Sequence, residues 1–290
     1  MLLDGKLVAS QIQREIQSAI AQLGGRKPCL AVIIVGDNPA SQIYVARKTK
    51  ACEQVGIESR RIAIDSHVEP DHLIQLIEKL NLDPAVDGIL LQLPLPDHLN
   101  PIDVLSHLSP EKDVDGLHPI NLGKLLIGEK DTFTPCTPLG IKTLLEYAKV
   151  DLTGMHALIL GRSNIVGKPM AAVLIQNTPD ANATVTIAHS RTKHLKELCL
   201  TADIIIACMG SPKFIKADMV KEGAIVIDVG INRIKNPSDE NKWQVVGDVD
   251  FDAVKDKCSY ITSVPGGVGP MTIAMLLSNT LKAYLKRFNN

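Results

Sequence analysis

Apolar, β-branched runs alternate along most of the chain with amphipathic stretches of helical period. In the first half, this pattern predicts strands over 30–35, 61–64 and 88–93, and helices over 8–23, 40–55 and 71–80. In the second half, it predicts strands over 157–160, 184–188, 204–207 and 224–229, and helices over 139–148, 169–176, 192–200 and 271–288, the last with Pro270 at its first position. Strands that alternate with helices are typical of parallel sheets covered by helices, so the predicted fold class is α/β.

Residues 94–137 interrupt this alternation. The segment is rich in Pro, Gly, Asp and Asn, and too little of it is periodic to form a core, so we expect functional loops and a domain connection. A chain of 290 residues is long enough for two ordinary cores. We therefore predict two α/β domains with a cleft between them: residues 1–120 plus 271–290, and residues 139–268 as a Rossmann-type dinucleotide-binding domain.

The composition favours a small-molecule partner. The 31 basic and 32 acidic residues give a formal net charge of −1, and no charged tail suggests nucleic acid or an anionic membrane as a partner. The six cysteines form no C-x-x-C pair, which indicates reduced thiols. The first residues match neither a signal peptide nor a transit peptide, and no apolar run approaches the roughly 20 residues that span a bilayer, so we expect a cytoplasmic protein.

A glycine turn joins the strand predicted over 157–160 to the next helix. Gly161 and Gly167 flank Ser163, which takes the place of the second glycine in the pattern G-x-G-x-x-G. Free amide groups and the helix dipole at such a turn bind a pyrophosphate, although an ordinary tight connection has the same sequence features.

The following strand favours NADP over NAD. It ends in His189-Ser190-Arg191, where a NAD-specific site would present an acidic side chain to the ribose. Arg162, Ser190 and Arg191 could instead bind a 2′-phosphate through charge-assisted hydrogen bonds. The alternative is that both arginines are solvated loop charges.

Three polar side chains share one face near the start of the helix predicted over 40–55. Ser41, Tyr44 and Lys48 are spaced by three and then four residues. Tyrosine offers a flat ring, and lysine offers a proton that burial or a neighbouring charge can make labile, although on ordinary helices such a pair is structural. Gln92 interrupts an apolar run at the carboxyl end of a strand, where a buried amide is expected to face a substrate crevice.

Asp113, Asp115 and His118 follow in the segment EKDVDGLHP. Without further carboxylates or cysteines they are weak evidence for a metal site, and we expect no metal. A single carboxylate suits another task, which is to accept two parallel N–H bonds from a flat amidine-like edge such as that of a pterin ring. Asp115 is the candidate, with loop capping or an Asx turn as the alternative.

Taken in chain order, these stretches resemble the bifunctional methylenetetrahydrofolate dehydrogenase/cyclohydrolase family from end to end. The segments that carry the resemblance are ASQIYVARKTKACEQVGI, DGILLQLPLP, PEKDVDGLHPINLG, FTPCTPLG, GRSNIVGKPMA, ADIIIACMG, VIDVGIN, GDVDF and PGGVGPMT. Their joint order is far more specific than any single motif.

The resemblance implies a role for each candidate residue. Tyr44 and Lys48 belong to the folate site, Gln92 orders the substrate and Asp115 binds the pterin. Ser41 is a further candidate beside them, and Gly267 and Thr272 line the cleft. The implied cofactor residues are Arg162, Ser163, Ile165, Ser190, Arg191 and Ile231, in addition to Gly161 of the glycine turn. The family is typically a homodimer whose carboxyl-terminal helix returns to the first domain.

The implied activity is oxidation of 5,10-methylenetetrahydrofolate with NADP⁺, followed by hydrolysis of the methenyl product to 10-formyltetrahydrofolate. Hydride transfer needs positioning but no side chain that removes a proton, whereas hydrolysis needs an acid or base, for which Lys48 is the candidate, with Gln92 tuning its position. Three alternatives remain: a monofunctional dehydrogenase of the same fold, an amino-acid or shikimate-type dehydrogenase, and a catalytically silent nucleotide sensor or scaffold.

Overall fold

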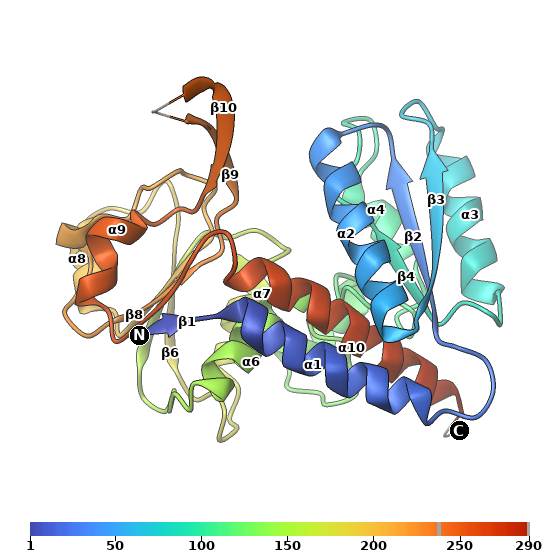
Figure 1. Cartoon of the computed structure of the whole chain (residues 1–290), viewed down its shortest axis with the longest axis horizontal. Helices are drawn as coiled ribbons and strands as arrows, with labels where there is room; N and C mark the ends of the chain where they lie inside the picture. Colours follow the sequence, from blue (N-terminus) through green and yellow to red (C-terminus); the bar gives the residue numbers. More distant parts are fainter. Residues whose placement is uncertain (237–238, 289–290) are drawn as a thin grey trace. The chain divides into compact units, whose positions relative to one another are not determined.

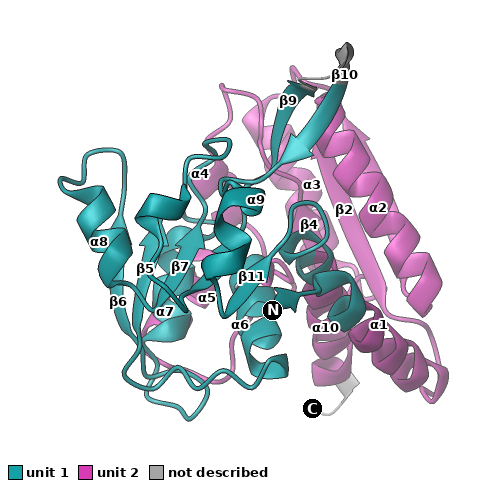
Figure 2. Ribbon diagram, turned by 60° about the vertical axis from the view of Figure 1, so that its left-hand side comes forward, with its two compact units in different colours: residues 1–9, 137–272 teal, residues 10–136, 273–290 magenta. Residues whose placement is uncertain are grey.

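The computed structural model describes residues 1–236 and 239–288, and within this part it leaves out the side chains of 236, 239–242 and 288. The chain divides into two compact units (Figure 2). Unit 1 comprises Met1–Ala9 and Thr137–Thr272, and unit 2 comprises Ser10–Cys136 and the segment from Ile273 onward. The division falls inside α1 (Gly5–Ala21) and α10 (Val268–Phe288) and just after the first residue of α6 (Cys136–Tyr147).

Unit 2 is built on a three-stranded parallel sheet in the order β3-β2-β4. The central strand β2 (Cys29–Val35) is buried along its whole length, between β3 (Glu58–Ile64) and β4 (Gly88–Leu91). Alternate residues of β2 pack in one apolar cluster with α3 (Pro70–Leu82), and Figure 1 shows the strands between α2 (Pro39–Val55) and α3. A strand buried on both faces explains the continuous apolar run that predicted it.

Local sequence signals set the bounds of α2. The side chain of Asn38 accepts hydrogen bonds from the N–H groups of Ala40 and Ser41, and Pro39 occupies the first helical position. The helix ends where Gly56 adopts a left-handed φ of 89°, which a residue with a Cβ adopts only at a cost. These two ends fix which residues of α2 face the sheet.

Unit 1 contains a six-stranded parallel sheet in the order β1-β11-β8-β7-β5-β6. Its strands are β1 (Leu2–Leu3), β5 (His156–Leu160), β6 (Thr184–Ala188), β7 (Ile204–Ala207), β8 (Ile225–Asp228) and β11 (Tyr260–Thr262). The other elements are α7 (Gly167–Leu174), α8 (Leu195–Thr201), α9 (Phe251–Val254), two 3₁₀ turns at Ala217–Met219 and Lys255–Lys257, and an antiparallel hairpin of β9 (Asn232–Asn236) and β10 (Asp239–Val246). Because the sheet is parallel, the loops after β5, β6 and β8 leave it at the same edge.

The predicted α/β class is confirmed, and the predicted long elements are found with shifts of a few residues at their ends. The segment 94–137, expected to form functional loops and a domain connection, also contains the short helices α4 (Pro101–Ser106) and α5 (Pro119–Leu126). Both begin with proline after a side-chain cap, Asn100 and His118 respectively, and both are too short to show a clear period.

One predicted helix boundary is corrected, and several short elements were not predicted. The last helix begins at Val268, so Pro270 is its third residue, where its missing N–H is still not needed for the helix. The strands β1 and β11 and the β9–β10 hairpin were not predicted, because the first two are very short and the hairpin is polar. Compactness also places residues 1–9 in unit 1, whereas the sequence prediction gave them to the first domain. The functional boundaries of the two domains stay a prediction.

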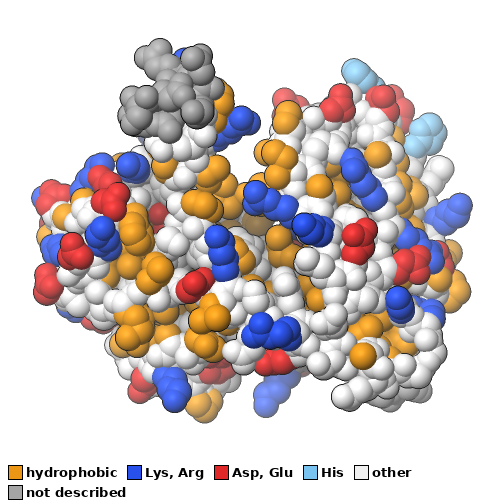
Figure 3. Space-filling model, viewed as in Figure 1, with side chains coloured by type: hydrophobic (Ala, Val, Ile, Leu, Met, Phe, Trp, Pro, Cys, Tyr) orange, Lys and Arg blue, Asp and Glu red, His pale blue; other side chains and the backbone are white. Residues whose placement is uncertain are grey.

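The described surface carries charges of both signs. Figure 3 shows lysine and arginine side chains interspersed with aspartate and glutamate on the face that it displays, as the near-zero net charge leads one to expect. Within the described ranges, no helix has the length and apolar character needed to cross a membrane.

Candidate functional site

Lys48 and Gln92 form a hydrogen-bonded pair in unit 2. Lys48, from the middle of α2, is only 9% exposed, which is rare for lysine. Gln92 directly follows β4, and its backbone N–H donates to the carbonyl of Ile33 at 2.9 Å. Its side-chain Nε2 donates to the carbonyl of Leu93 at 2.6 Å, which leaves Oε1 to accept a bond of 3.0 Å from Lys48 Nζ. The two residues singled out from separate elements are thus in direct contact.

Ser41 and Tyr44 precede Lys48 on α2. Ser41 is 4% exposed, and within the described part of the chain its hydroxyl has no hydrogen-bond partner. A buried hydroxyl without a partner costs about 1–3 kcal/mol, so it is an atom that a bound ligand would satisfy. Burial raises the pKa of the half-buried Tyr44 above its ordinary value.

The half-buried Asp115 lies in a tight turn between Asp113 and Gly116. Gly116 has a φ of 73°, and a Cβ at this position would lie 2.6 Å from the backbone nitrogen of Pro135. The backbone carbonyl of Asp115 accepts a hydrogen bond of 3.3 Å from the N–H of Cys136. The segment 133–136, which is distant in sequence, therefore packs against the turn that carries Asp115.

Asp113 organises the same turn, a role that sequence reasoning missed. Its carboxylate is 1% exposed and accepts hydrogen bonds from the N–H groups of Leu117 and His118 and from Nδ2 of Asn121, at 3.2, 2.8 and 2.8 Å. Burial raises the pKa of Asp113, and these bonds oppose the shift. The sequence shows Asp113 as a second aspartate in EKDVDG, but its hydrogen-bond partners come from residues later in the chain.

The His118 ring also has structural partners. Its Nδ1 accepts a hydrogen bond from the N–H of Ile120, which caps α5, and its Nε2 lies 3.2 Å from the carbonyl of Ser106. Among the residues that the structure describes, no cluster of three His, Cys, Asp or Glu side chains is arranged to hold a metal ion.

Cys136 is a buried thiol beside the turn that carries Asp115. Burial raises the pKa of its thiol well above the usual value, the Asp115 carboxylate raises it further, and Lys48 opposes the shift. The Cys136 thiol also donates to the carbonyl of Val114 at 3.3 Å, next to Asp115.

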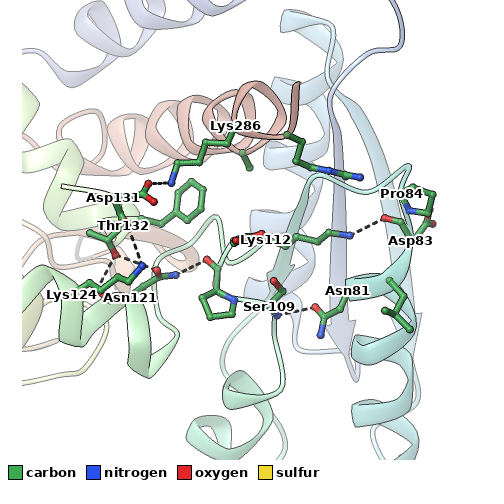
Figure 4. Close-up of a pocket in the computed structure, with 16 residues that line it drawn as sticks. Asn81, Asp83, Pro84, Ser109, Lys112, Asn121, Lys124, Asp131, Thr132 and Lys286 are labelled. Carbon is green, nitrogen blue, oxygen red and sulfur yellow. Dashed lines mark hydrogen bonds and ion pairs between the residues drawn. The ribbon is translucent and has the colours of Figure 1, made fainter. Parts of the chain in front are cut away.

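A separate cavity of about 360 Å³ also belongs to unit 2. Its lining includes Lys112, Asn121, Asp131 and Lys286 but none of the predicted substrate-site residues (Figure 4). Lys112 Nζ donates to the backbone carbonyls of Leu80 and Asp83 in its wall, at 3.0 and 2.8 Å. The cavity therefore lies apart from the Lys48–Gln92 pair.

In unit 1, the glycine turn after β5 is tightly packed. Gly161 has a φ of 135°, and a Cβ there would lie 2.5 Å from the carbonyl oxygen of Cys208. Ser163 Oγ accepts hydrogen bonds from the N–H groups of Val166 and Gly167, at the start of α7, at 3.1 and 3.4 Å. Its own hydroxyl proton remains suited to donation to a phosphate oxygen. The turn fits the pyrophosphate-binding role predicted for it.

The other predicted cofactor residues lie at the same edge of the sheet, on exposed loops. Arg162 and Ile165 follow β5, Ser190 and Arg191 follow β6, and Ile231 follows β8. Exposed arginines beside a glycine turn are suitable for an anionic dinucleotide, so the residues present fit NADP.

Two buried carboxylates, Asp228 and Asp248, accept hydrogen bonds from the loops at this edge of the sheet. The sequence analysis gave neither residue a role. Asp228 accepts hydrogen bonds from the N–H groups of Gly230, Asp248 and Val249, at 3.0, 2.8 and 2.9 Å. Asp248 accepts two more from backbone N–H groups after β7. Burial raises the pKa of Asp228 to about 6. The pair fixes the loop that carries Ile231.

Gly267 and Thr272 also belong to unit 1. Gly267 is buried, and a Cβ there would lie 2.7 Å from that of Thr262. Thr272 Oγ1 lies 3.0 Å from the hydroxyl of Thr137 and donates to the carbonyl of Val268 at 3.3 Å. The structure thus groups the substrate-site candidates Ser41, Tyr44, Lys48, Gln92 and Asp115 in unit 2, and Gly267 and Thr272 with the cofactor candidates in unit 1.

Comparison with known families matches most of the chain. Residues 3–115 match the model of the tetrahydrofolate dehydrogenase/cyclohydrolase catalytic domain, and residues 135–288 match that of the corresponding NAD(P)-binding domain.

Individual relatives match along their whole length. The bifunctional protein FolD of Protochlamydia amoebophila is 61% identical over 289 residues, covering 100% of this chain and 99% of that protein. Among solved structures, the bifunctional FolD methylenetetrahydrofolate dehydrogenase/cyclohydrolase of Campylobacter jejuni has a TM-score of 0.93 at 49% identity, covering 99% of each chain. The dehydrogenase-cyclohydrolase FolD of Trypanosoma brucei, complexed with NADP and an inhibitor, has a TM-score of 0.93 at 36% identity, covering 100% of this chain and 99% of that one.

Proposed function

Because the chain belongs to the tetrahydrofolate dehydrogenase/cyclohydrolase family, we propose that it oxidises 5,10-methylenetetrahydrofolate with NADP⁺ and hydrolyses the methenyl product to 10-formyltetrahydrofolate. The relatives named above are bifunctional, which favours both activities over a monofunctional dehydrogenase. NADP⁺ supplies the hydride acceptor when it is bound, with the Gly161 turn and the arginines after β5 and β6 as its proposed site.

We assign the folate site to unit 2. The Asp115 carboxylate accepts two N–H bonds from the pterin edge, the Tyr44 ring stacks on the folate, and the Ser41 hydroxyl gives its unused bond to the ligand. The proposed dehydrogenase step needs these groups for orientation alone, because no proton leaves the substrate with the hydride.

The hydrolytic step depends on Lys48. Water adds to the methenyl carbon, and a proton must then reach the ring nitrogen as the carbon–nitrogen bond opens. The observation that carries the proposal is the 3.0 Å bond between Lys48 Nζ and Gln92 Oε1, which holds a largely buried amine beside the proposed folate site.

The decisive experiment compares both activities in Lys48→Met. Methionine keeps the apolar stem and removes the amine, so we expect loss of cyclohydrolase activity by about a hundredfold or more, with folate binding and some dehydrogenase activity retained. Absorbance at 340 nm follows the first reaction, and a stopped assay of methenyl hydrolysis follows the second. Full cyclohydrolase activity in Lys48→Met would remove the assignment.

We further propose a preference for NADP over NAD, a homodimeric assembly and a cytoplasmic location. The exposed Arg162 and Arg191 support the first, and the family resemblance supports the other two. Binding of 2′,5′-ADP checks the cofactor preference, light scattering checks the mass of the assembly, and fractionation of cells checks the location. Tighter binding of NAD than NADP would contradict the proposed role of the arginines.

A further inference from the structure

We propose that Asn279, on the carboxyl-terminal helix α10, is a positioning residue that sets the orientation of the Asp115 carboxylate toward the pterin edge. The inference rests on the folate site proposed above. Asn279 is 4% exposed, belongs to unit 2, and is separated in sequence from every predicted substrate-site residue of that unit.

The amide of Asn279 bridges the turn that carries Asp115 and the segment 133–136. Its Nδ2 donates to the carbonyl of Val114 at 2.9 Å and to the carbonyl of Thr134 at 3.2 Å. The same nitrogen lies 3.7 Å from Sγ of Cys136. The Asn279 side chain therefore joins the turn that carries Asp115 to the segment 133–136, which packs against this turn.

These contacts fix the backbone on both sides of Asp115. The Val114 carbonyl belongs to the peptide unit before Asp115, and it also accepts a hydrogen bond from the Cys136 thiol at 3.3 Å. The Asp115 carbonyl belongs to the next peptide unit, and it accepts from the Cys136 N–H at 3.3 Å. Because a peptide unit is planar, holding both units restricts the φ and ψ of Asp115 and so the direction of its side chain.

The face of α10 that carries Asn279 follows the neighbouring segment along its length. Lys282 Nζ donates to the carbonyl of Thr132 at 2.7 Å, and Lys286 pairs with Asp131, the latter contact visible in Figure 4. Both ammonium groups also lie over the ring of Phe133, at 5.2 and 5.3 Å from its centroid. These contacts hold α10 against residues 131–133, next to the segment that Asn279 contacts.

A fixed carboxylate direction matters because two parallel N–H bonds require the carboxylate plane to match the ligand edge. Leucine would fill the space of Asn279 but donate nothing, and an ionised aspartate would face two carbonyl oxygens with no proton to offer. Asparagine is therefore the side chain of this size that can hold both carbonyls.

The test measures folate and NADP⁺ kinetics in Asn279→Ala and Asn279→Leu. We expect the KM for methylenetetrahydrofolate and for the methenyl substrate to rise about tenfold, as for the loss of an oriented charged contact, while the KM for NADP⁺ changes less than about twofold. In the double variant with Asp115→Ala, we expect no more than about a further twofold loss, because Asn279 acts through Asp115.

Thr280→Val is the matched control. Thr280 is fully buried on the same helix, but among the described residues its hydroxyl bonds only within the helix, to the carbonyl of Leu276 at 2.8 Å. We expect it to lower the melting temperature without changing either folate KM. Should the first two variants not fold, Asn279→Ser keeps one donor, and we expect for it a smaller rise in folate KM at a temperature well below its melting point.

The outcomes separate the two proposals. An unchanged folate KM in Asp115→Ala would show that the proposed folate site is wrong. A raised KM in Asp115→Ala together with an unchanged KM in the Asn279 variants would leave that site standing and overturn the positioning role. Additive losses in the double variant would also overturn it.

Discussion

The partner of Lys48 is an amide rather than a carboxylate, and this choice determines what the amine can do. Gln92 presents Oε1 to the amine because its Nε2 is occupied by the Leu93 carbonyl. A neutral acceptor orients the amine without forming an ion pair. The pair is suited to a residue that must exchange a proton during hydrolysis.

Replacing Gln92 with glutamate tests this point. The new charge is expected to hold the proton on Lys48, so we predict that Gln92→Glu slows the cyclohydrolase about tenfold or more at pH 7 and the dehydrogenase much less. Both rates are measured with saturating substrates between pH 6 and 9. Gln54→Glu adds the same charge at an exposed position of α2 and serves as the control. Equal losses of both activities in Gln92→Glu would point to substrate binding instead.

Asp228 gives the stability of the protein a predictable dependence on pH. Burial raises its pKa from 3.8 to about 6, so between these values the folded state binds a proton that the unfolded state has released. A raised carboxyl pKa contributes stability at low pH that is lost as the pH rises through about 6. We predict that the free energy of unfolding of the wild type, relative to Asp228→Asn, falls by up to about 3 kcal/mol from pH 4 to 7.

Urea unfolding of both proteins at several pH values measures this difference. The comparison with Asp228→Asn cancels the contributions of other carboxylates, such as Asp203, whose pKa is lowered by its hydrogen bonds to Lys221 and the N–H of His156. A difference that stays constant, or that grows as the pH rises, would contradict the raised pKa of Asp228.

At the scale of elements, long apolar runs were predictable and short polar elements were not. The strand β2 reads as seven buried residues, and α2 has an asparagine cap and a terminal glycine, so both are found close to their predicted bounds. The helices α4 and α5 have six and eight residues, too few to display a period. The short strand β11 is defined by its neighbours in the sheet rather than by its own residues.

The turn that carries Asp115 allows a controlled test of backbone packing. Gly116 and Gly154 have nearly equal φ values, 73° and 74°, but a Cβ at Gly116 would lie 2.6–2.8 Å from backbone atoms of 133–135, whereas a Cβ at Gly154 would meet nothing within 4 Å. Alanine at either position carries the same left-handed strain, about 1–2 kcal/mol. Only Gly116→Ala must also displace a neighbouring segment.

We therefore predict that Gly116→Ala raises the KM for methylenetetrahydrofolate and destabilises the protein more than Gly154→Ala. Gly154→Ala should show the strain alone, with folate KM unchanged. Thermal unfolding and steady-state kinetics of the two variants provide the comparison. Equal stability losses together with an unchanged folate KM in Gly116→Ala would mean that the turn can move without disturbing Asp115.

At the scale of the whole chain, sequence reasoning identified candidate residues but not the residues that support them. Gln92 was predicted to tune the position of Lys48, and the structure shows a hydrogen bond between them. The supporting groups Asp113, Asp248 and Asn279 act through partners that are distant in sequence, or through backbone N–H and carbonyl groups that leave no residue-specific signal. Such contacts become visible only when the chain is folded.

The cysteines provide a probe of how each unit opens. All six are free, and burial raises the pKa of every thiol, to about 12 for Cys52 and Cys208 and about 11 for Cys258. The remaining three, with pKa values raised in the same way, are Cys29, Cys136 and Cys199. Because the thiolate is the reactive form, about one thiol in a thousand or fewer is reactive at pH 8.

We predict that the native protein reacts slowly with a thiol reagent such as 5,5′-dithiobis(2-nitrobenzoate) at pH 8, whereas the unfolded chain exposes all six thiols at once. Cys208 and Cys258 are partly exposed and should react first, and Cys52 and Cys136 should wait for unit 2 to open. Mass spectrometry of labelled peptides at successive times measures the order.

If each unit opens by itself, NADP should slow labelling of the thiols in unit 1 more than those in unit 2, and a folate ligand should do the reverse. Equal protection of both sets by either ligand would show that the two units unfold as one cooperative body.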